Sequence, residues 1–250
     1  MINYQPRIQR TVLIVLVALG AAVATSAQPS ALAQNVSAPA LSGTQRADFR
    51  GETVTPGTRH IAEWAVHSGD HQRLPFIVVD KVHATAAAFD ASGQLIATTP
   101  VLIGMGIGDT FPPGVINMDM YQTLPSQRIT PAGRFFAEED RNLKGQRVLW
   151  VDYDAGIAIH KLSSKKTKQR RHERMASASA VDRRITFGCI NVRPAFYEQV
   201  VSPGFRRKGG IVYVLPDVTP LKSVFRSYDV APTYAQQSGA QARSADVRKF

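Results

Sequence analysis

Short apolar runs separated by turn residues dominate the middle of the chain. Residues 75–89 form one β-type stretch, which reaches the turn signal Asp90–Gly93 and returns along residues 94–103. Apolar runs bounded by Gly, Asp and Ser are typical of strands that pair as a hairpin. We therefore predict a long β-hairpin at the start of the folded region.

Further strands are predicted downstream. Residues 148–152 and 157–160 flank a turn and predict a second hairpin, and residues 210–215 predict a last buried strand. A helix is expected over residues 194–201, because Pro194 suits a first helical turn. Many short strands with only one or two short helices predict a mostly β domain.

The composition and the hydrophobic pattern divide the chain into four regions. Residues 1–33 combine a basic start, an apolar run too short to span a bilayer and a small-residue cleavage pattern, which together predict a signal peptide. Residues 34–71 are expected to be a linker with a short helix near 61–66, residues 72–217 the β domain, and residues 218–250 a polar tail. Export predicts a periplasmic or secreted protein, with no transmembrane segment after cleavage.

Charge adds a possible surface contact. The chain carries 30 Lys and Arg against 19 Asp and Glu, a formal net charge of +11. Within Lys165–Arg174, six basic residues accompany one acid, Glu173. Two interpretations remain open for this basic run: a solvated loop insertion, or a contact with an anionic wall or outer-membrane component. An exported protein rarely meets nucleic acid, so we expect no nucleic-acid function.

The single cysteine, Cys189, has no partner for an internal disulfide, and it is either a buried inert thiol or a nucleophile. It follows Gly188 at a strand end and precedes the helix expected at residue 194. Backbone N–H groups there could face an oxyanion, and the helix N-terminus would favour the thiolate. Of the six histidines, only His160 closes an apolar strand in the same β region, so it is the candidate base. A purely structural role for His160 stays open.

These segments together resemble the L,D-transpeptidase catalytic domain, the YkuD family. The resemblance rests on His160, on the motif Thr-Phe-Gly-Cys-Ile at residues 186–190 and on the turn Thr-Pro-Ala-Gly-Arg-Phe at residues 130–135. It extends over residues 74–216. The resemblance implies a β-sandwich that acts on peptidoglycan stem peptides through a cysteine nucleophile and needs no cofactor.

By this resemblance, Cys189 is the nucleophile, His160 is the general base, and the backbone N–H groups of Gly188 and Cys189 hold the oxyanion. The thiolate would attack a carbonyl of the stem peptide and expel D-alanine. The acyl group would then pass to an amine of a second stem peptide or of a wall-attached protein.

Three residues of the motif are expected to contact substrate: Thr186, Phe187 and Asn191. Two of them depart from the common family pattern, which has His at the position of Phe187 and Arg at that of Asn191. An amide cannot hold a carboxylate as a guanidinium does, so carboxylate recognition is expected to use another residue, or the substrate differs. The 28 residues between His160 and Cys189 also make a longer gap than is usual for the family.

The sequence leaves three functions open: a transpeptidase, a hydrolase that uses water at the same site, and a non-catalytic wall-binding module. The two enzymes share Cys189 and His160 and differ only in the acyl acceptor. No metal site is expected, because His67 and His71 lie four residues apart without acidic or cysteine companions.

Overall fold

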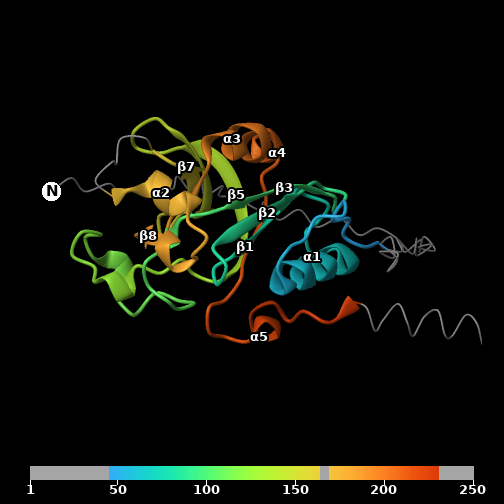
Figure 1. The fold of residues 1–250 in the computed structure, drawn as a ribbon, viewed down its shortest axis with the longest axis horizontal. Coiled ribbons are helices and arrows are strands. Elements are labelled where there is room, and N and C mark those ends of the chain that lie inside the picture. The colour runs from blue at the N-terminus through green and yellow to red at the C-terminus, as the bar shows by residue number, and fades with distance from the viewer. Residues whose placement is uncertain (1–44, 164–168, 231–250) are drawn as a thin grey trace, which may run out of the picture. The chain divides into compact units, whose positions relative to one another are not determined.

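The computed structural model describes residues 45–163 and 169–230. The expected signal peptide, the beginning of the expected linker, the first part of the basic run (residues 165–168) and most of the polar tail lie outside these residues. The fold is mostly β, as predicted (Figure 1). Within the described residues, no helix has the length and apolar character needed to cross a bilayer.

Eight strands form one mixed sheet in the order β3-β2-β1-β10-β5-β6-β7-β9. Their bounds are β1 Phe76–Asp80, β2 Thr85–Phe89, β3 Leu95–Pro100, β5 Gly133–Arg141, β6 Arg147–Asp152, β7 Ile157–Lys161, β9 Ile190–Val192 and β10 Gly210–Val214. Neighbouring strands are antiparallel, except that β1 pairs with β10 and β7 with β9 in parallel. Two short strands, β4 (Ile103–Gly104) and β8 (Arg184–Thr186), form a separate parallel pair.

Strand β5 joins the two halves of the large sheet. Its residues 133–137 pair with β10, whereas its residues 138–141 pair with β6. Buried residues of β1, β2 and β10 lie in one cluster with buried residues of β6, β7 and β9, which we call the central core. Because both halves contribute to this core, the sheet curls into two packed layers, as in a β-sandwich.

The opposite face of β1, β2 and β10 is also buried, in a second cluster that we call the outer core. Phe76 and Tyr213 point to this side and pack with Ile61 and Trp64 of helix α1, Pro56–Ser68. In Figure 1, α1 and α5 (Leu221–Phe225) lie on one side of β1, and α3 (Pro194–Phe196) and α4 (Ser202–Phe205) on the other. Since β1 and β10 are covered on both faces, every residue of these two strands is buried.

The described residues contain more helix than the one or two short helices expected. Helix α1 is longer than the short helix expected near residues 61–66, and both α1 and α5 lie in segments expected to be a linker and a tail. Their apolar faces are covered by the sheet, which explains why they are ordered. Helix α2 (Arg171–Ala176) belongs to the basic run.

The start of the sheet also differs from the single hairpin predicted. The expected stretch 75–89 is broken by a turn between β1 and β2. The Asp80 carboxylate makes this turn by accepting a hydrogen bond from the His83 N–H at 3.0 Å, and Ala84 adopts a left-handed φ of 48°. The apolar residues on either side conceal the turn in the sequence, so two hairpins open the sheet.

The downstream elements agree with the predictions. Strands β6 and β7 pair as a hairpin, and β10 is the last strand of the sheet. The helix expected over residues 194–201 is present as α3 (Pro194–Phe196), a π-helical segment (Tyr197–Val201) and α4 (Ser202–Phe205). Apolar side chains of this stretch pack into the central core next to the strands that carry His160 and Asn191.

Candidate active site

The two candidate catalytic residues lie on neighbouring parallel strands. Strand pairing places His160 of β7 beside Asn191 of β9, and Ile159 beside Ile190. Ile159 and Ile190 point into the central core. Because side chains alternate along a strand, His160 and Asn191 lie on the other face, and Cys189, the residue directly before β9, is the neighbour of Asn191 on that face. The structure thus brings the predicted nucleophile and base to one face of adjacent strands.

The thiol of Cys189 is only partly buried, in contrast to the apolar residues around it. It donates a hydrogen bond to the Gly156 carbonyl, with 3.4 Å between Sγ and the oxygen. Gly156 belongs to the turn between β6 and β7, so this turn forms one wall beside the thiol.

Two threonine hydroxyls hold the loop that leads to Cys189. Thr186 Oγ1 accepts from the Gly188 N–H at 3.1 Å and donates to the Cys189 carbonyl at 2.6 Å. Thr130 Oγ1 donates to the Gly188 carbonyl at 2.7 Å and accepts from the Gly104 N–H at 2.9 Å. Thr186 therefore both donates and accepts within the loop, and Thr130 joins the loop to β4, so the backbone is held on both sides of Gly188.

Position 188 requires glycine. Gly188 has a φ of 131°, in a region that L-residues rarely adopt. A Cβ atom there would lie 2.7 Å from the Ile129 carbonyl oxygen and 2.7 Å from Ile157 Cδ1. The close approach of the turn at residues 130–133 to the cysteine loop therefore depends on the missing side chain.

The predicted oxyanion donors are not equivalent. Because the Gly188 N–H is bonded to the Thr186 hydroxyl, it would have to leave this bond to serve a developing oxyanion. The N–H of Cys189 is the other predicted donor, and it lies at the nucleophile itself.

The three residues expected to contact substrate lie in different environments. Thr186 is buried and holds the loop, and Asn191 has 0% of its surface exposed. Phe187 is partly exposed, with its ring 4.1 Å from the guanidinium carbon of Arg128 and edge-on to Tyr121 at 5.7 Å. Of the three, Phe187 is therefore the residue placed to meet a ligand at the surface.

Asn191 connects His160 to Arg171, whose role sequence reasoning missed. Arg171 Nη1 donates to Asn191 Oδ1 at 2.6 Å, and Asn191 Nδ2 lies 3.0 Å from His160 Nε2. A guanidinium can only donate, so Asn191 must turn its oxygen to Arg171 and its amino group to His160. The facing Nε2 then accepts, and Nδ1, 3.2 Å from the carbonyl oxygen of Lys161, carries the proton. This chain of contacts selects one neutral tautomer of His160.

Arg171 lies at the start of α2 and is only 5% exposed. Burial lowers the pKa of its guanidinium, and the negative charge of the Cys189 thiolate partly opposes this change. Its Nε donates to Gln169 Oε1 at 2.7 Å. Part of the basic run is thus neither solvated nor available for a surface contact. The one signal in the sequence is the four-residue spacing of Arg171 and Met175, the two buried residues of α2.

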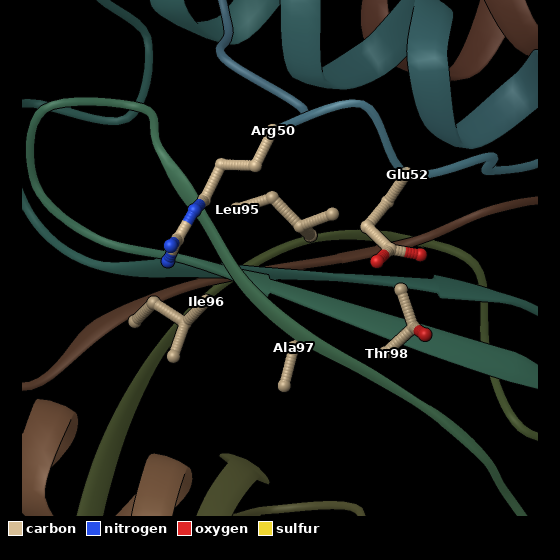
Figure 2. Close-up of a pocket in the computed structure, with 6 residues that line it drawn as sticks. All are labelled: Arg50, Glu52, Leu95, Ile96, Ala97 and Thr98. Carbon is tan, nitrogen blue, oxygen red and sulfur yellow. The ribbon is translucent and has the colours of Figure 1, made fainter.

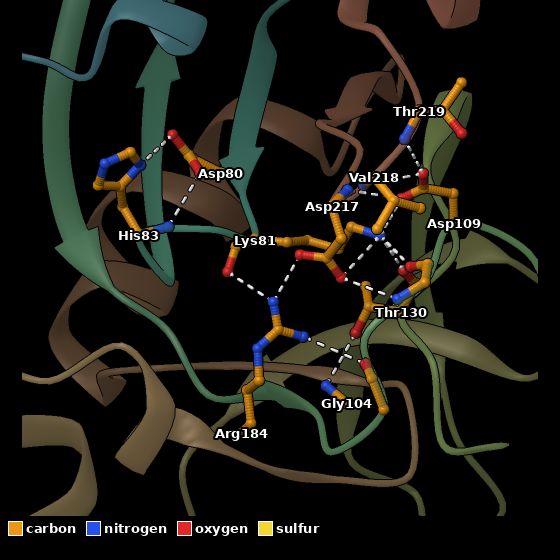
Figure 3. A network of polar contacts seen from close by, with 12 residues as sticks. Asp80, Lys81, His83, Gly104, Asp109, Thr130, Arg184, Asp217, Val218 and Thr219 are labelled. Atoms are coloured by element: carbon orange, nitrogen blue, oxygen red, sulfur yellow. Dashed lines mark hydrogen bonds and ion pairs between the residues drawn. The ribbon is translucent and has the colours of Figure 1, made fainter. Parts of the chain in front are cut away.

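A buried ionic network supports the cysteine loop through Thr130 (Figure 3). The Lys81 ammonium is 1% exposed; it donates to the Thr130 carbonyl at 2.9 Å and to the Asp109 carboxylate at 3.0 Å. Burial alone would raise the pKa of Asp109, but the backbone N–H groups of Thr219 and Asp217 and the Lys81 ammonium hold it well below its usual range.

Arg184 extends this network to the strand that precedes the cysteine loop. Its guanidinium donates to the Asp217 carboxylate at 2.5 Å and to the Lys81 carbonyl at 3.0 Å. Since Arg184 begins β8 and Thr186 ends it, the network reaches the loop from both the strand before it and the turn at Thr130.

Two surface pockets are bordered by other residues than Cys189 and His160. A pocket of about 290 Å³ lies along β3, one edge of the sheet, and is lined by Arg50, Glu52 and residues 95–98 (Figure 2). Its lining carries no group suited to nucleophilic or acid–base chemistry beyond one carboxylate. A second pocket of about 480 Å³ lies beside α2 and has a mainly apolar lining that includes Leu162 and Met175.

Comparison with known proteins gives similarity of structure but not of sequence. No protein-family model matches the chain, and no curated protein sequence matches it. Solved structures with a similar fold include an L,D-transpeptidase from Xylanimonas cellulosilytica, at 16% identity and a TM-score of 0.37, with 56% of this chain and 60% of that chain covered.

Two other similar structures are the helical cell shape determining protein Pgp2 from Campylobacter jejuni and the catalytic domain of the E. faecium L,D-transpeptidase. The first is 15% identical with a TM-score of 0.39, and covers 58% of this chain and 49% of that chain. The second is 16% identical with a TM-score of 0.34, and covers 58% and 99%. The chain therefore spans less than two thirds of the first two structures.

Proposed function

We propose that this chain is a cysteine acyltransferase of the L,D-transpeptidase type that acts on peptidoglycan stem peptides. The observation that carries the proposal is the placement of Cys189, His160 and Asn191 on one face of β7 and β9. An inert structural cysteine would lie among apolar side chains. Cys189 is instead partly exposed and lies on the same face as a candidate base, and Asn191, two residues further on, binds the guanidinium of Arg171.

In the proposed reaction, the Cys189 thiol gives its proton to Nε2 of His160, which exchanges its contact with Asn191 for the thiol. The thiolate attacks the stem-peptide carbonyl that precedes D-alanine, and the N–H of Cys189 donates to the oxyanion. The C–N bond breaks as His160 returns the proton to the leaving amine of D-alanine. An acceptor amine then attacks the thioester, loses its proton to His160 and releases Cys189, which regains a proton.

The substrate class rests on the resemblance of residues 130–135 and 186–190 to the family motifs. The signal-peptide pattern of residues 1–33 supports a periplasmic or secreted location, and the exposed part of the basic run remains the proposed contact with an anionic wall or outer-membrane component. We also propose that the catalytic domain extends beyond residues 72–217 to include α1 and α5, because both pack in the outer core.

Acyl transfer is tested by incubating the protein with a disaccharide-tetrapeptide and a D-amino acid, and by following the products by mass. Exchange of the terminal D-alanine for the added amino acid is the expected result, and Cys189→Ser should abolish it. A shortened stem without exchange would point to the hydrolase. No product, together with retained binding to isolated sacculi, would point to the non-catalytic module and contradict the proposal.

A further inference from the structure

We propose that Arg171 is a positioning residue for the proposed reaction: it holds the Asn191 amide in the one orientation that keeps Nε2 of His160 unprotonated and so able to take up the thiol proton, and it supplies a positive charge near Cys189. This inference rests on the proposed function for its place in catalysis. The contacts that carry it are the 2.6 Å hydrogen bond from Arg171 to Asn191 and the 3.0 Å contact from Asn191 to His160.

The orientation of Asn191 is the first step. An amide flipped by 180° would direct its amino group at the guanidinium, donor against donor, and its oxygen at Nε2. Such an oxygen would favour a proton on Nε2 and so would stabilise a histidine that cannot accept the thiol proton. Arg171 excludes this state, because its five N–H groups have no acceptor capacity.

The charge of Arg171 is the second step. A buried guanidinium is costly unless an anion or several hydrogen bonds compensate it. The two partners recorded for Arg171 are the neutral amides of Gln169 and Asn191, and in the described part of the chain no carboxylate pairs with it. Arg171 binds Asn191, two residues after Cys189, and a negative charge on the Cys189 thiolate opposes the fall in the pKa of Arg171 that burial causes. Charge stabilisation between the two is mutual, so Arg171 favours the thiolate.

Of the charged groups near Cys189, Arg171 is the cation assigned to its thiolate. His160 lies on the same face of the neighbouring strand β7, and Arg171 of α2 binds Asn191, which follows Cys189 on that face. The Lys161 ammonium is instead paired with Glu198 at 2.9 Å. Arg170 is exposed and pairs with Glu173 on the surface of α2. With only 5% of its surface exposed, Arg171 cannot itself bind a substrate carboxylate. Its proposed role is therefore to position Asn191 and His160, and not to recognise the substrate.

This placement gives the basic run a role at the site. Helix α2 begins within it and lies between His160 and Cys189 in the sequence. The family pattern has an arginine at the position of Asn191. In this chain the guanidinium near the nucleophile comes instead from Arg171, in the segment after β7, and it is hydrogen-bonded to the Asn191 side chain.

The test measures the reactivity of Cys189 directly, without acyl transfer. Iodoacetamide alkylation is followed by intact mass between about pH 5 and 9, and the single cysteine makes the site of reaction unambiguous. We expect Arg171→Gln to slow alkylation near neutral pH by about tenfold, the effect of losing a hydrogen bond to a charged group. Arg171→Lys, which keeps the charge without the planar fork, should give an intermediate rate.

Arg170→Gln is the matched control, since it removes the same charge at the exposed N-cap of α2, one residue away, and its alkylation profile should equal that of the wild type. Equal profiles for Arg171→Gln and Arg170→Gln, in proteins with equal melting temperatures, would overturn the proposal. If Arg171→Gln does not fold, Asn191→Ala removes the bridge with Arg171 still in place, and an unchanged profile in that variant would overturn it as well. Slowed alkylation in a protein without acyl transfer would refute the proposed function and leave this inference standing.

Discussion

Gly188 shows how the shape of the cysteine loop depends on a single missing methyl group. Its carbonyl accepts from Thr130, its N–H donates to Thr186, and its α-carbon lies against the backbone at Ile129. The loop is therefore held by hydroxyls and by close packing, and Cys189 is carried at the end of a rigid turn. Rigid support of this kind is what a nucleophile needs in order to meet a carbonyl at a fixed distance.

Gly188→Ala is expected to destabilise the fold by about 2–4 kcal/mol, because the added Cβ overlaps backbone and adds to an unfavourable φ. Urea unfolding, followed by circular dichroism, measures this change.

The matched control is Gly145→Ala, at a left-handed glycine with a φ of 72° and no atom within 4 Å of its added Cβ. This variant should lower the free energy of unfolding by only about 1 kcal/mol, because the left-handed φ is its only unfavourable feature. If the two variants were equally stable, close packing would not be the reason for glycine at position 188.

Some helices and strands of the fold could be predicted from local sequence patterns, and others could not. The hairpin β6–β7, the helical stretch after Pro194 and the last strand could be predicted, because each is marked by its own turn or cap. The turn after Asp80 could not, since apolar residues flank it on both sides. The packing of α1 against the sheet depends on partners more than a hundred residues away in β10, which no local pattern reveals.

In the candidate site, too, some residues could be predicted from the sequence and some contacts could not. Cys189 and His160 could be singled out from the sequence because His160 lies near the end of an apolar strand and Cys189 lies in a motif that directly precedes another; the structure brings them to one face of the sheet. The contact of Arg171 with Asn191 could not be predicted, because it depends on where α2 returns to the sheet, and a basic run looks like a solvated surface. The role of Thr130 in holding the Gly188 carbonyl is equally non-local.

The segment after α5 is joined to α1 by a titratable contact. His60 lies 2.8 Å from the Ser227 hydroxyl through Nε2 and 3.2 Å from the Asp229 carboxylate through Nδ1. Burial lowers the pKa of His60, and the attraction of Asp229 partly opposes this effect. Since the unfolded chain then binds the proton more readily than the folded one, stability should fall as the pH decreases below about 6.5.

Asp229→Asn removes the attraction that favours protonated His60, so this fall should become steeper in the variant. His60→Gln removes the titrating group and should flatten it. Melting temperatures measured from about pH 5 to 8 give the three profiles. Parallel profiles for the wild type and His60→Gln would show that His60 does not contribute.

At the scale of the whole molecule, the network around Lys81 joins segments that are far apart in the sequence. Lys81 follows β1, Asp109 lies in the loop after β4, and Asp217 follows β10. One ammonium therefore stabilises two buried carboxylates at the point where these segments meet beneath the cysteine loop (Figure 3). A network of this kind favours one arrangement of the segments over others, because each partner is costly to leave unpaired.

Lys81→Met should destabilise the protein by about 3–5 kcal/mol, since it leaves Asp109 buried without its cation and Asp217 with Arg184 alone. It should also reduce acyl transfer, because the Thr130 carbonyl loses its donor. Chemical unfolding and the mass-based transfer assay measure the two effects. Lys144→Met, at an exposed turn, is the control and should change neither; a loss of stability equal in both variants would contradict the assignment.

The position of β10 between β1 and β5 has a consequence for how the chain folds. The first three strands and the strands from β5 to β9 are neighbours in the sheet only through β10, whose last residue is Val214. A nascent chain cannot close this sheet until nearly all of it has been synthesised, and the pairing of β1 with β10 closes a loop of more than a hundred residues. Folding should therefore be slow and should begin late, because the two halves of the sheet meet only once β10 has been synthesised.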